Sequence, residues 1–376
     1  MDSVDLRAPE CYPHPVGRIE VLETHISRVF LTGDLAYKLK KPVNLGFLDF
    51  STLEARHFYC EEEVRLNRRT APAIYLGVVP VTASEGGARI GGRGRVVDYA
   101  VKMRQFSQDA LLERMARAHA VEPRHVDTLA DTLAAFHGAA GRTTRFGSAA
   151  RILACVLDNL DALEIEGGPV DWLRRWTRNE HGRLLPAFAE RRAGGAVREC
   201  HGDLHLANVV CIDGHPMPFD CIEFSEELRW IDVMSDLAFL TMDLAGHGLA
   251  PLAHRLLDRY LSATGDYGGL RVLRFYEVFR ALVRAKVARL RQSQCPPGSR
   301  AAAAARAECS RRIELACGLA VAGVPALVLM HGLSGSGKTT VSQQVVERFG
   351  AVRVRSDVER KRLHGMAALA ARAAMP

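Results

Sequence analysis

The stretch HGDLHLAN at residues 201–208 decides which fold and which chemistry are expected of this chain. It fits the pattern H-x-D-x-x-x-x-N, and a predicted hairpin with strands at 209–212 and 217–220 follows it at once. The second strand ends on Asp220. A tight hairpin is therefore expected to bring Asn208 and Asp220 close together.

These residue types match what phosphoryl transfer from ATP requires. One carboxylate must accept or orient the proton of the acceptor hydroxyl, while an amide and a second carboxylate hold Mg²⁺ against the phosphates. We assign Asp203 to the catalytic role, and Asn208 and Asp220 to the metal. The competing interpretation is a turn rich in Asp and His whose side chains only satisfy local hydrogen bonds.

A lysine near the N-terminus supplies a matching group for the nucleotide. The segment Leu35-Ala36-Tyr37-Lys38 has the form of the V-A-I-K strand, whose lysine meets the nucleotide phosphates. It is expected to form a hairpin with residues 29–31. Read alone, the segment would fit a hairpin with a solvated lysine better than a nucleotide site.

A helix predicted at residues 52–68 should carry the carboxylate partner of this lysine. Ser51 and Glu54 form an S-x-x-E capping box at its start. Among the acids that follow, Glu63 is our choice, and Glu62 is nearly as good. The chain has no G-x-G-x-x-G loop, so the turn at residues 24–27 is expected to cover the phosphates with backbone N–H and hydroxyl donors.

Residues 20–290 resemble the aminoglycoside phosphotransferase family, a branch of the protein-kinase-like fold. The strongest match is HGDLHLANV, and the segment DCIEF at 220–224, continued through Asp232 and Asp236, is also similar. The resemblance implies an α+β fold with a small mixed β-sheet lobe and a larger helical lobe. It also implies transfer of the γ-phosphoryl group of ATP to a hydroxyl of a small molecule. Asp232 and Asp236 are expected to be structural rather than catalytic.

The rest of this region shows alternating strand and helix patterns. Further strands are predicted at 74–81 and 95–103, with a Gly-rich loop at 85–94 between them. An amphipathic helix is indicated by the spacing of Val126, Leu129, Leu133 and Phe136. Other helical patterns cover 149–164, 170–192, 232–247, 251–263 and 270–292.

A second phosphate-binding motif lies near the C-terminus. GLSGSGKT at 332–339 matches the P-loop pattern G-x-x-x-x-G-K-[ST], after a predicted buried strand at 327–330 and before a predicted helix at 340–349. A second strand is predicted at 352–357. The residues expected to bind phosphate are Gly332, Gly335, Gly337, Lys338 and Thr339.

This last segment resembles small P-loop kinases of the AAA or zeta type. The order of the two parts resembles bacterial bifunctional proteins that join a phosphotransferase to an ATP-binding domain. No strand with a Walker B acid follows, so we expect an incomplete α/β P-loop segment that binds phosphate weakly and does not catalyse. The predicted domains are a kinase-like sheet lobe at 1–108, a helical lobe at 109–320, and the partial P-loop domain at 321–376.

Composition narrows the partners and the compartment. The chain has 376 residues, a net charge of +7 and a pI of about 9.0, which favours anionic partners such as nucleotides. A nucleic-acid surface on the basic helix at 280–291 is less favoured than a solvated amphipathic face. The nine cysteines are scattered and form no CxxC pair, so the reducing cytoplasm is expected. The longest apolar stretch, 319–330, is too short for a membrane span, and no signal peptide is expected.

Two functions compete on this evidence. The first is an ATP- and Mg²⁺-dependent phosphotransferase acting on a small molecule through Asp203. The second is a non-catalytic nucleotide-binding or regulatory protein, that is, a pseudokinase with a remnant P-loop. The absent Gly-rich loop and the partial second domain favour the second function, and the co-occurrence of the base, both metal positions and Lys38 favours the first.

Overall fold

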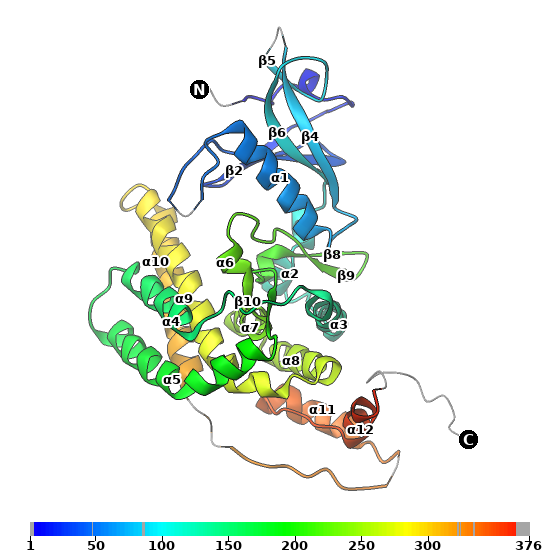
Figure 1. Cartoon of the computed structure of the whole chain (residues 1–376), viewed down its shortest axis with the longest axis vertical. Helices are drawn as coiled ribbons and strands as arrows, with labels where there is room; N and C mark the ends of the chain where they lie inside the picture. The colour runs from blue at the N-terminus through cyan, green and yellow to red at the C-terminus, as the bar shows by residue number, and fades with distance from the viewer. Residues whose placement is uncertain are drawn as a thin grey trace. The chain divides into compact units, whose positions relative to one another are not determined.

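The computed structural model describes residues 4–46, 48–84, 87–321, 323, 325–333 and 335–365 (Figure 1). The chain forms two compact units, a sheet unit (Met1–Arg114, His201–Asp203 and Ala207–Arg229) and a helical unit (Met115–Cys200, Leu204–Leu206 and Trp230–Pro376). This combination is the expected α+β class. The domain boundaries given above stay a prediction.

One six-stranded sheet forms the body of the sheet unit. Its order is β1-β2-β3-β6-β4-β5, and neighbouring strands pair antiparallel. The strands are β1 (Glu20–Glu23), β2 (Ser27–Leu31), β3 (Leu35–Lys40), β4 (Tyr75–Ser84), β5 (Gly87–Ile90) and β6 (Val96–Arg104). The predicted hairpin of β2 and β3 is confirmed. Strand β5 corrects the prediction of a plain loop at 85–94, because Ala88 and Ile90 are buried against the sheet while their neighbours are exposed.

Both faces of the sheet are covered, and strand β3 contributes to each. Alternate side chains of a strand point to opposite faces. Ala36 lies in the apolar cluster shared with helix α1 (Leu53–Asn67), whereas Tyr37 and Leu39 lie in a second cluster with the N-terminal segment. Lysines at 38 and 40 therefore share the face that carries α1.

The start of α1 differs from the prediction by one residue. Thr52, not Ser51, is the N-cap, and its hydroxyl accepts a hydrogen bond of 3.1 Å from the Ala55 backbone N–H. The backbone oxygen of Ser51 instead accepts from the Arg56 guanidinium at 3.2 Å. Serine and threonine are both favoured at the N-cap, so a shift of one residue keeps the helix capped.

A short hairpin and a few turns of helix complete the sheet unit. Strands β8 (Val209–Ile212) and β9 (His215–Pro218) pair antiparallel, which confirms the predicted hairpin. Strand β9 lies two residues earlier than the predicted strand 217–220, so Asp220 follows the strand instead of ending it. The remaining elements at the margins of this unit are η1 (Pro9–Cys11), η2 (Gln108–Ala110), α2 (Leu112–Arg117), η3 (Leu206–Asn208) and α6 (Glu226–Arg229).

The helical unit is built around α7 (Val233–Gly246). Residues 233–244 of this helix are all buried, and α8 and α9 pack against it. Among the described residues, no helix is both long and apolar enough to cross a membrane. The other elements are α3 (Pro123–Ala139), α4 (Ala149–Asp161), α5 (Gly168–Ala193), α8 (Ala250–Thr264), η4 (Tyr267–Gly269), α9 (Leu270–Gln294), α10 (Arg300–Ala320) and the strand pair β7 (Val197–Glu199) and β10 (Trp230–Asp232).

Glu277 on α9 should make the stability of the helical unit depend on pH. Burial raises its pKa to about 7, although its carboxylate accepts a hydrogen bond of 2.7 Å from the Thr241 hydroxyl. The folded state therefore favours the neutral acid, and this contribution is lost as the pH rises from about 5 through 7. We expect Glu277→Gln to be more stable than the wild type by about 1–2 kcal/mol at pH 8, and not at pH 5. Urea unfolding at both values tests this, and parallel pH profiles would contradict it.

The P-loop segment belongs to the helical unit and corrects two predictions. Helices α11 (Lys338–Phe349) and α12 (Ser356–Leu363) form, and Figure 1 shows α11 beside α8. The apolar run at 327–330 is not a buried strand, since Leu327 and Leu329 are 85% and 82% exposed. The predicted strand at 352–357 is also absent. Among the described residues of this segment no other strand is available, and a strand needs a paired neighbour to satisfy its backbone.

Candidate active site

Lys38 lies between two carboxylates of the sheet unit. Its Nζ atom is 2.8 Å from Glu63 Oε1 and 2.5 Å from Asp220 Oδ1. The Glu63 side chain is fully buried, whereas the Asp220 side chain is 43% exposed. The structure thus brings together one predicted phosphate-binding lysine, its chosen partner acid and one predicted metal ligand. Glu62, the alternative partner, instead contacts Arg65 and Arg229.

A second lysine, which the sequence analysis did not single out, shares Glu63. Lys40 Nζ donates to Glu63 Oε2 at 2.8 Å and also to Glu223 Oε1. The sequence could have indicated Lys40, because it lies two residues after Lys38 and residues i and i+2 of a strand lie on one face. Nothing in the sequence pattern pointed to Glu223 as its partner.

The charges of this cluster stabilise one another. Burial alone would raise the pKa of Glu63, but Lys38 and Lys40 outweigh it and lower this pKa to about 2. Burial likewise disfavours the Lys38 ammonium, yet Asp220 and Glu63 raise its pKa well above the usual value. Glu223 contacts a single lysine, and burial raises its pKa. Glu63 and Lys38 are therefore both ionised at neutral pH.

The backbone around Asp220 is held by one side chain from β4 and one from α1. The Asp220 N–H donates to the Tyr75 hydroxyl at 3.1 Å, and the next N–H, of Cys221, donates to Asn67 Oδ1 at 2.8 Å. Asp220 has a φ of +62°, a left-handed conformation that Asp tolerates better than most residues. Such a conformation persists only where the surroundings enforce it.

Asn208 is joined both to Asp203 and to the neighbour of Asp220. Its amide nitrogen donates 3.0 Å hydrogen bonds to the backbone oxygen and to Oδ2 of Asp203. Its backbone oxygen accepts from the Phe219 N–H at 3.0 Å, which continues the β8–β9 ladder by one pair. The hairpin therefore places Asn208 next in register to the residue that precedes Asp220.

His201 and Gly202 fix the backbone that carries Asp203. His201 is buried, its Nε2 contacts the Phe219 backbone oxygen at 2.8 Å, and its own oxygen accepts from the Ile222 N–H at 3.1 Å. Gly202 has a φ of +88°, and a Cβ there would lie 2.8 Å from the Leu228 backbone oxygen. Only glycine fits this position without a backbone shift.

The turn at 24–27, which connects β1 and β2, uses most of its donors internally. The Thr24 hydroxyl accepts from the backbone N–H groups of Ile26 at 3.3 Å and Ser27 at 2.9 Å. The Thr24 N–H donates to the Ser27 oxygen at 2.9 Å. This turn is compact, unlike an open ring of amides around phosphate.

Gly332, Gly335, Gly337 and Thr339 are exposed, and the half-buried Lys338 closes the loop that they belong to. Its Nζ donates to the backbone oxygens of Gly332 at 2.7 Å and Leu333 at 2.6 Å. Gly332, Gly335 and Gly337 have positive φ angles, and Thr339 follows in the first turn of α11. Ser334 lies outside the described residues.

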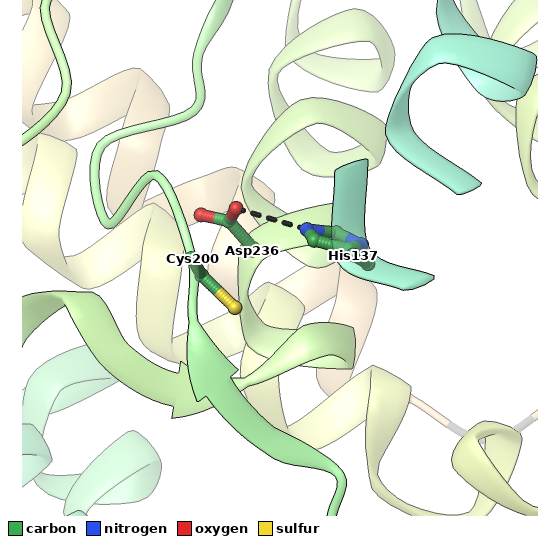
Figure 2. Close-up of side chains that lie close together, drawn as sticks. All are labelled: His137, Cys200 and Asp236. Carbon is green, nitrogen blue, oxygen red and sulfur yellow. Dashed lines mark hydrogen bonds and ion pairs between the residues drawn. The ribbon is translucent and has the colours of Figure 1, made fainter. Parts of the chain in front are cut away.

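A separate polar cluster is buried in the helical unit. Figure 2 shows His137 of α3 and Asp236 of α7 pointing toward one another beside Cys200, and these three could reach a single metal ion. Both ring nitrogens of His137 already have protein partners, Asp236 Oδ2 at 3.2 Å and the Tyr260 hydroxyl at 2.8 Å. The cluster is therefore satisfied without a cation.

Asp232, which was expected to be structural like Asp236, is also buried and contacts protein groups. Asp232 caps α7 by accepting from the Met234 N–H at 2.9 Å, and it pairs with the Arg191 guanidinium at 2.6 Å. Asp232 and Asp236 both have buried protein partners, as the structural interpretation expects.

Comparison with known proteins identifies the class. The profile of the phosphotransferase enzyme family matches residues 62–276, more than half of the chain, including Glu63, Asp203, Asn208 and Asp220. The chain belongs to this family of phosphotransferases. Residues 327–374 match the profile of an AAA domain, in agreement with the P-loop pattern.

Relatives match along nearly the whole chain. Uncharacterized proteins of Mycobacterium tuberculosis and Mycobacterium bovis are 34% identical over 369 residues, which cover 94% of this chain and 70% of each relative. The likeness thus includes the P-loop segment as well as the phosphotransferase part.

Solved structures show a weaker likeness. Amicoumacin kinase in complex with AMP-PNP, Ca²⁺ and Ami matches with a TM-score of 0.49 and 12% identity, over 84% of this chain and 90% of that one. The GDP complex of aminoglycoside 2'-phosphotransferase-IIIa gives 0.47 and 14%, over 82% and 94%. A choline/ethanolamine kinase family protein from Mesorhizobium loti gives 0.45 and 17%, over 80% and 92%. At these values no substrate is carried over to this chain.

Proposed function

We propose that this phosphotransferase moves the γ-phosphoryl group of ATP to a hydroxyl of a small molecule. The observation that carries the proposal is the position of Lys38 between Glu63 and Asp220, 2.8 and 2.5 Å away. In the same unit, Asp203 is hydrogen-bonded to Asn208. Lys38 would bind the nucleotide phosphates, and Glu63 would hold Lys38 in place.

The donor atoms suit a magnesium ion. Mg²⁺ prefers oxygen ligands and tolerates few protein groups. The Asn208 amide nitrogen is engaged with Asp203, which leaves its oxygen for a cation, and the Asp220 carboxylate is partly exposed. Asn208 and Asp220 would hold the ion, which when bound neutralises charge on the phosphates.

Asp203 would act as the base. Its carboxylate is oriented by the Asn208 amide, and its backbone is fixed by His201 and Gly202. In the proposed reaction the acceptor hydroxyl gives its proton to Asp203 while its oxygen bonds to the transferred phosphorus, and ADP leaves. Positioning supplies most of the rate in such reactions, since little covalent chemistry falls to the protein.

A panel assay tests the proposal directly. The full chain is incubated with Mg²⁺, ATP and hydroxyl-bearing metabolites and antibiotics, while ADP release and phosphorylated products are followed by mass spectrometry. At least one acceptor is expected to give ADP and phosphorylated product in equal amounts. Binding of Mg²⁺-ATP without transfer to any acceptor would favour the alternative, a non-catalytic nucleotide-binding protein. The compact turn at 24–27 is the observation in favour of that alternative.

The P-loop segment is proposed to bind nucleotide phosphate as a second, weaker site. Binding would require Lys338 to release the backbone oxygens of Gly332 and Leu333. We expect calorimetry with Mg²⁺-ATP to show two binding events in the wild type, and Lys338→Ala to lose the weaker one. Lys38→Ala should lose the other event, and a single event that both variants retain would contradict this assignment.

A further inference from the structure

Lys40 is more deeply buried than Lys38 and is bound on every side by protein. Its side chain is 1% exposed, and Lys38's is 12% exposed. Its ammonium contacts Glu63 Oε2 and Glu223 Oε1, and it lies 5.0 Å from the centre of the Phe50 ring. It is therefore enclosed by its own partners and out of reach of a nucleotide.

The two lysines divide the carboxylate of Glu63 between them. Lys40 makes a hydrogen bond to Oε2, whereas Lys38 makes an ion pair at Oε1, an oxygen without an aligned hydrogen bond. Both contacts are 2.8 Å long, and the hydrogen bond from Lys40 fixes Oε2 and with it the direction in which Oε1 faces Lys38. The hydrogen bond that Lys38 itself donates goes to Asp220.

The charge balance explains why a second lysine is needed. The cluster contains two lysines and three carboxylates, those of Glu63, Asp220 and Glu223. Without Lys40, three carboxylates would compete for Lys38, and the two buried ones would attract it away from Asp220. With Lys40 present, Glu223 is occupied and Lys38 stays between Glu63 and Asp220.

We infer that Lys40, together with Glu223, is a positioning residue that orients Glu63 and so holds Lys38 toward the nucleotide phosphates. The inference rests on the proposed function, because it assumes that Lys38 binds those phosphates. It assigns Lys40 no contact with substrate.

The test replaces the buried pair as a whole. Lys40→Met with Glu223→Met removes one positive and one negative charge, so the net charge of the cluster stays the same. Buried ion pairs can often be replaced by apolar residues of similar size without loss of stability. The background is the full chain carrying Lys338→Ala, which removes the proposed second nucleotide site. Lys102→Met on β6 serves as the control, because the half-buried Lys102 has no ion pair among the described residues.

Calorimetry with Mg²⁺-AMP-PNP and with adenosine separates positioning from general damage. We expect the double variant to bind Mg²⁺-AMP-PNP about tenfold more weakly, while its affinity for adenosine is unchanged. The Lys102 control should match the background chain with both ligands. Unchanged affinity of the double variant for Mg²⁺-AMP-PNP, or an equal loss with adenosine, would overturn the inference.

Two further outcomes are distinguishable. If the background chain does not bind Mg²⁺-AMP-PNP at all, the proposed function fails rather than the role of Lys40. If the double variant does not fold, Lys40→Arg is measured instead. Arginine keeps the charge but spreads it over a planar fork that cannot reproduce two point contacts. If Lys40 is a positioning residue, Lys40→Arg should bind Mg²⁺-AMP-PNP about threefold or more weakly, with its affinity for adenosine unchanged. An unchanged affinity of this variant for Mg²⁺-AMP-PNP would count against the positioning role.

Discussion

Asp203→Asn is expected to lower the turnover of the phosphotransferase about 10²- to 10⁴-fold, with the acceptor found in the panel assay. The amide cannot take the proton of the acceptor hydroxyl, so the oxygen that attacks phosphorus loses its base. The fold should be retained, because the asparagine oxygen can still accept the 3.0 Å hydrogen bond from Asn208. Affinity for Mg²⁺-AMP-PNP should change little, since the proposed role of Asp203 concerns the acceptor.

Asp213→Asn provides the matched control for this variant. Asp213 lies in the exposed turn of the β8–β9 hairpin, in the same unit, and has a φ of +52° that asparagine also tolerates. Steady-state kinetics of both variants, with melting temperatures measured in parallel, separate a catalytic effect from a folding effect. If Asp203→Asn turned over the acceptor as fast as Asp213→Asn, Asp203 would not be the base.

The local parts of the site could be predicted from sequence because they depend on neighbours in the chain. The spacing of Asp203 and Asn208 is fixed by one turn, and the hairpin that follows needs only the Asp213-Gly214 turn and two short strands. Amphipathic helices were predicted for the same reason. Helix α4, for example, starts at Ala149 as predicted and ends three residues early, at Asp161.

Other parts depend on tertiary contacts that no local pattern encodes. The pairing of Lys40 with Glu223 joins residues 183 positions apart, and either residue alone resembles an ordinary surface charge. The apolar run at 327–330 reads as a buried strand, yet its burial requires partner strands that the described residues around it do not provide. The choice of Glu63 over Glu62 was close for the same reason. The orientation of α1 on the sheet decides it, and sequence spacing does not.

Glu63→Gln is expected to have the largest effect on stability. Glu63 is completely buried between Lys38 and Lys40, so the neutral amide would remove one ion pair from each lysine and leave Lys38 with Asp220 alone and Lys40 with Glu223 alone. Breaking a buried ion pair on one side typically costs about 3–5 kcal/mol. Glu61→Gln, on the same helix, should cost about 1 kcal/mol or less, because the Glu61 side chain is 59% exposed and its contact with His57 lies at the protein surface.

The measurement should report on the sheet unit itself. The three tryptophans, at 172, 176 and 230, all lie in the helical unit, so hydrogen exchange of peptides from β3 and α1 is the better probe. The pKa of Glu63 is lowered to about 2, so its contribution is present above about pH 5 and is lost as the pH falls toward 2. The difference in exchange between wild type and Glu63→Gln should therefore be full at pH 7 and shrink in acid. If the Glu61 and Glu63 variants lost equal protection, Glu63 would not be the partner that the lysines require.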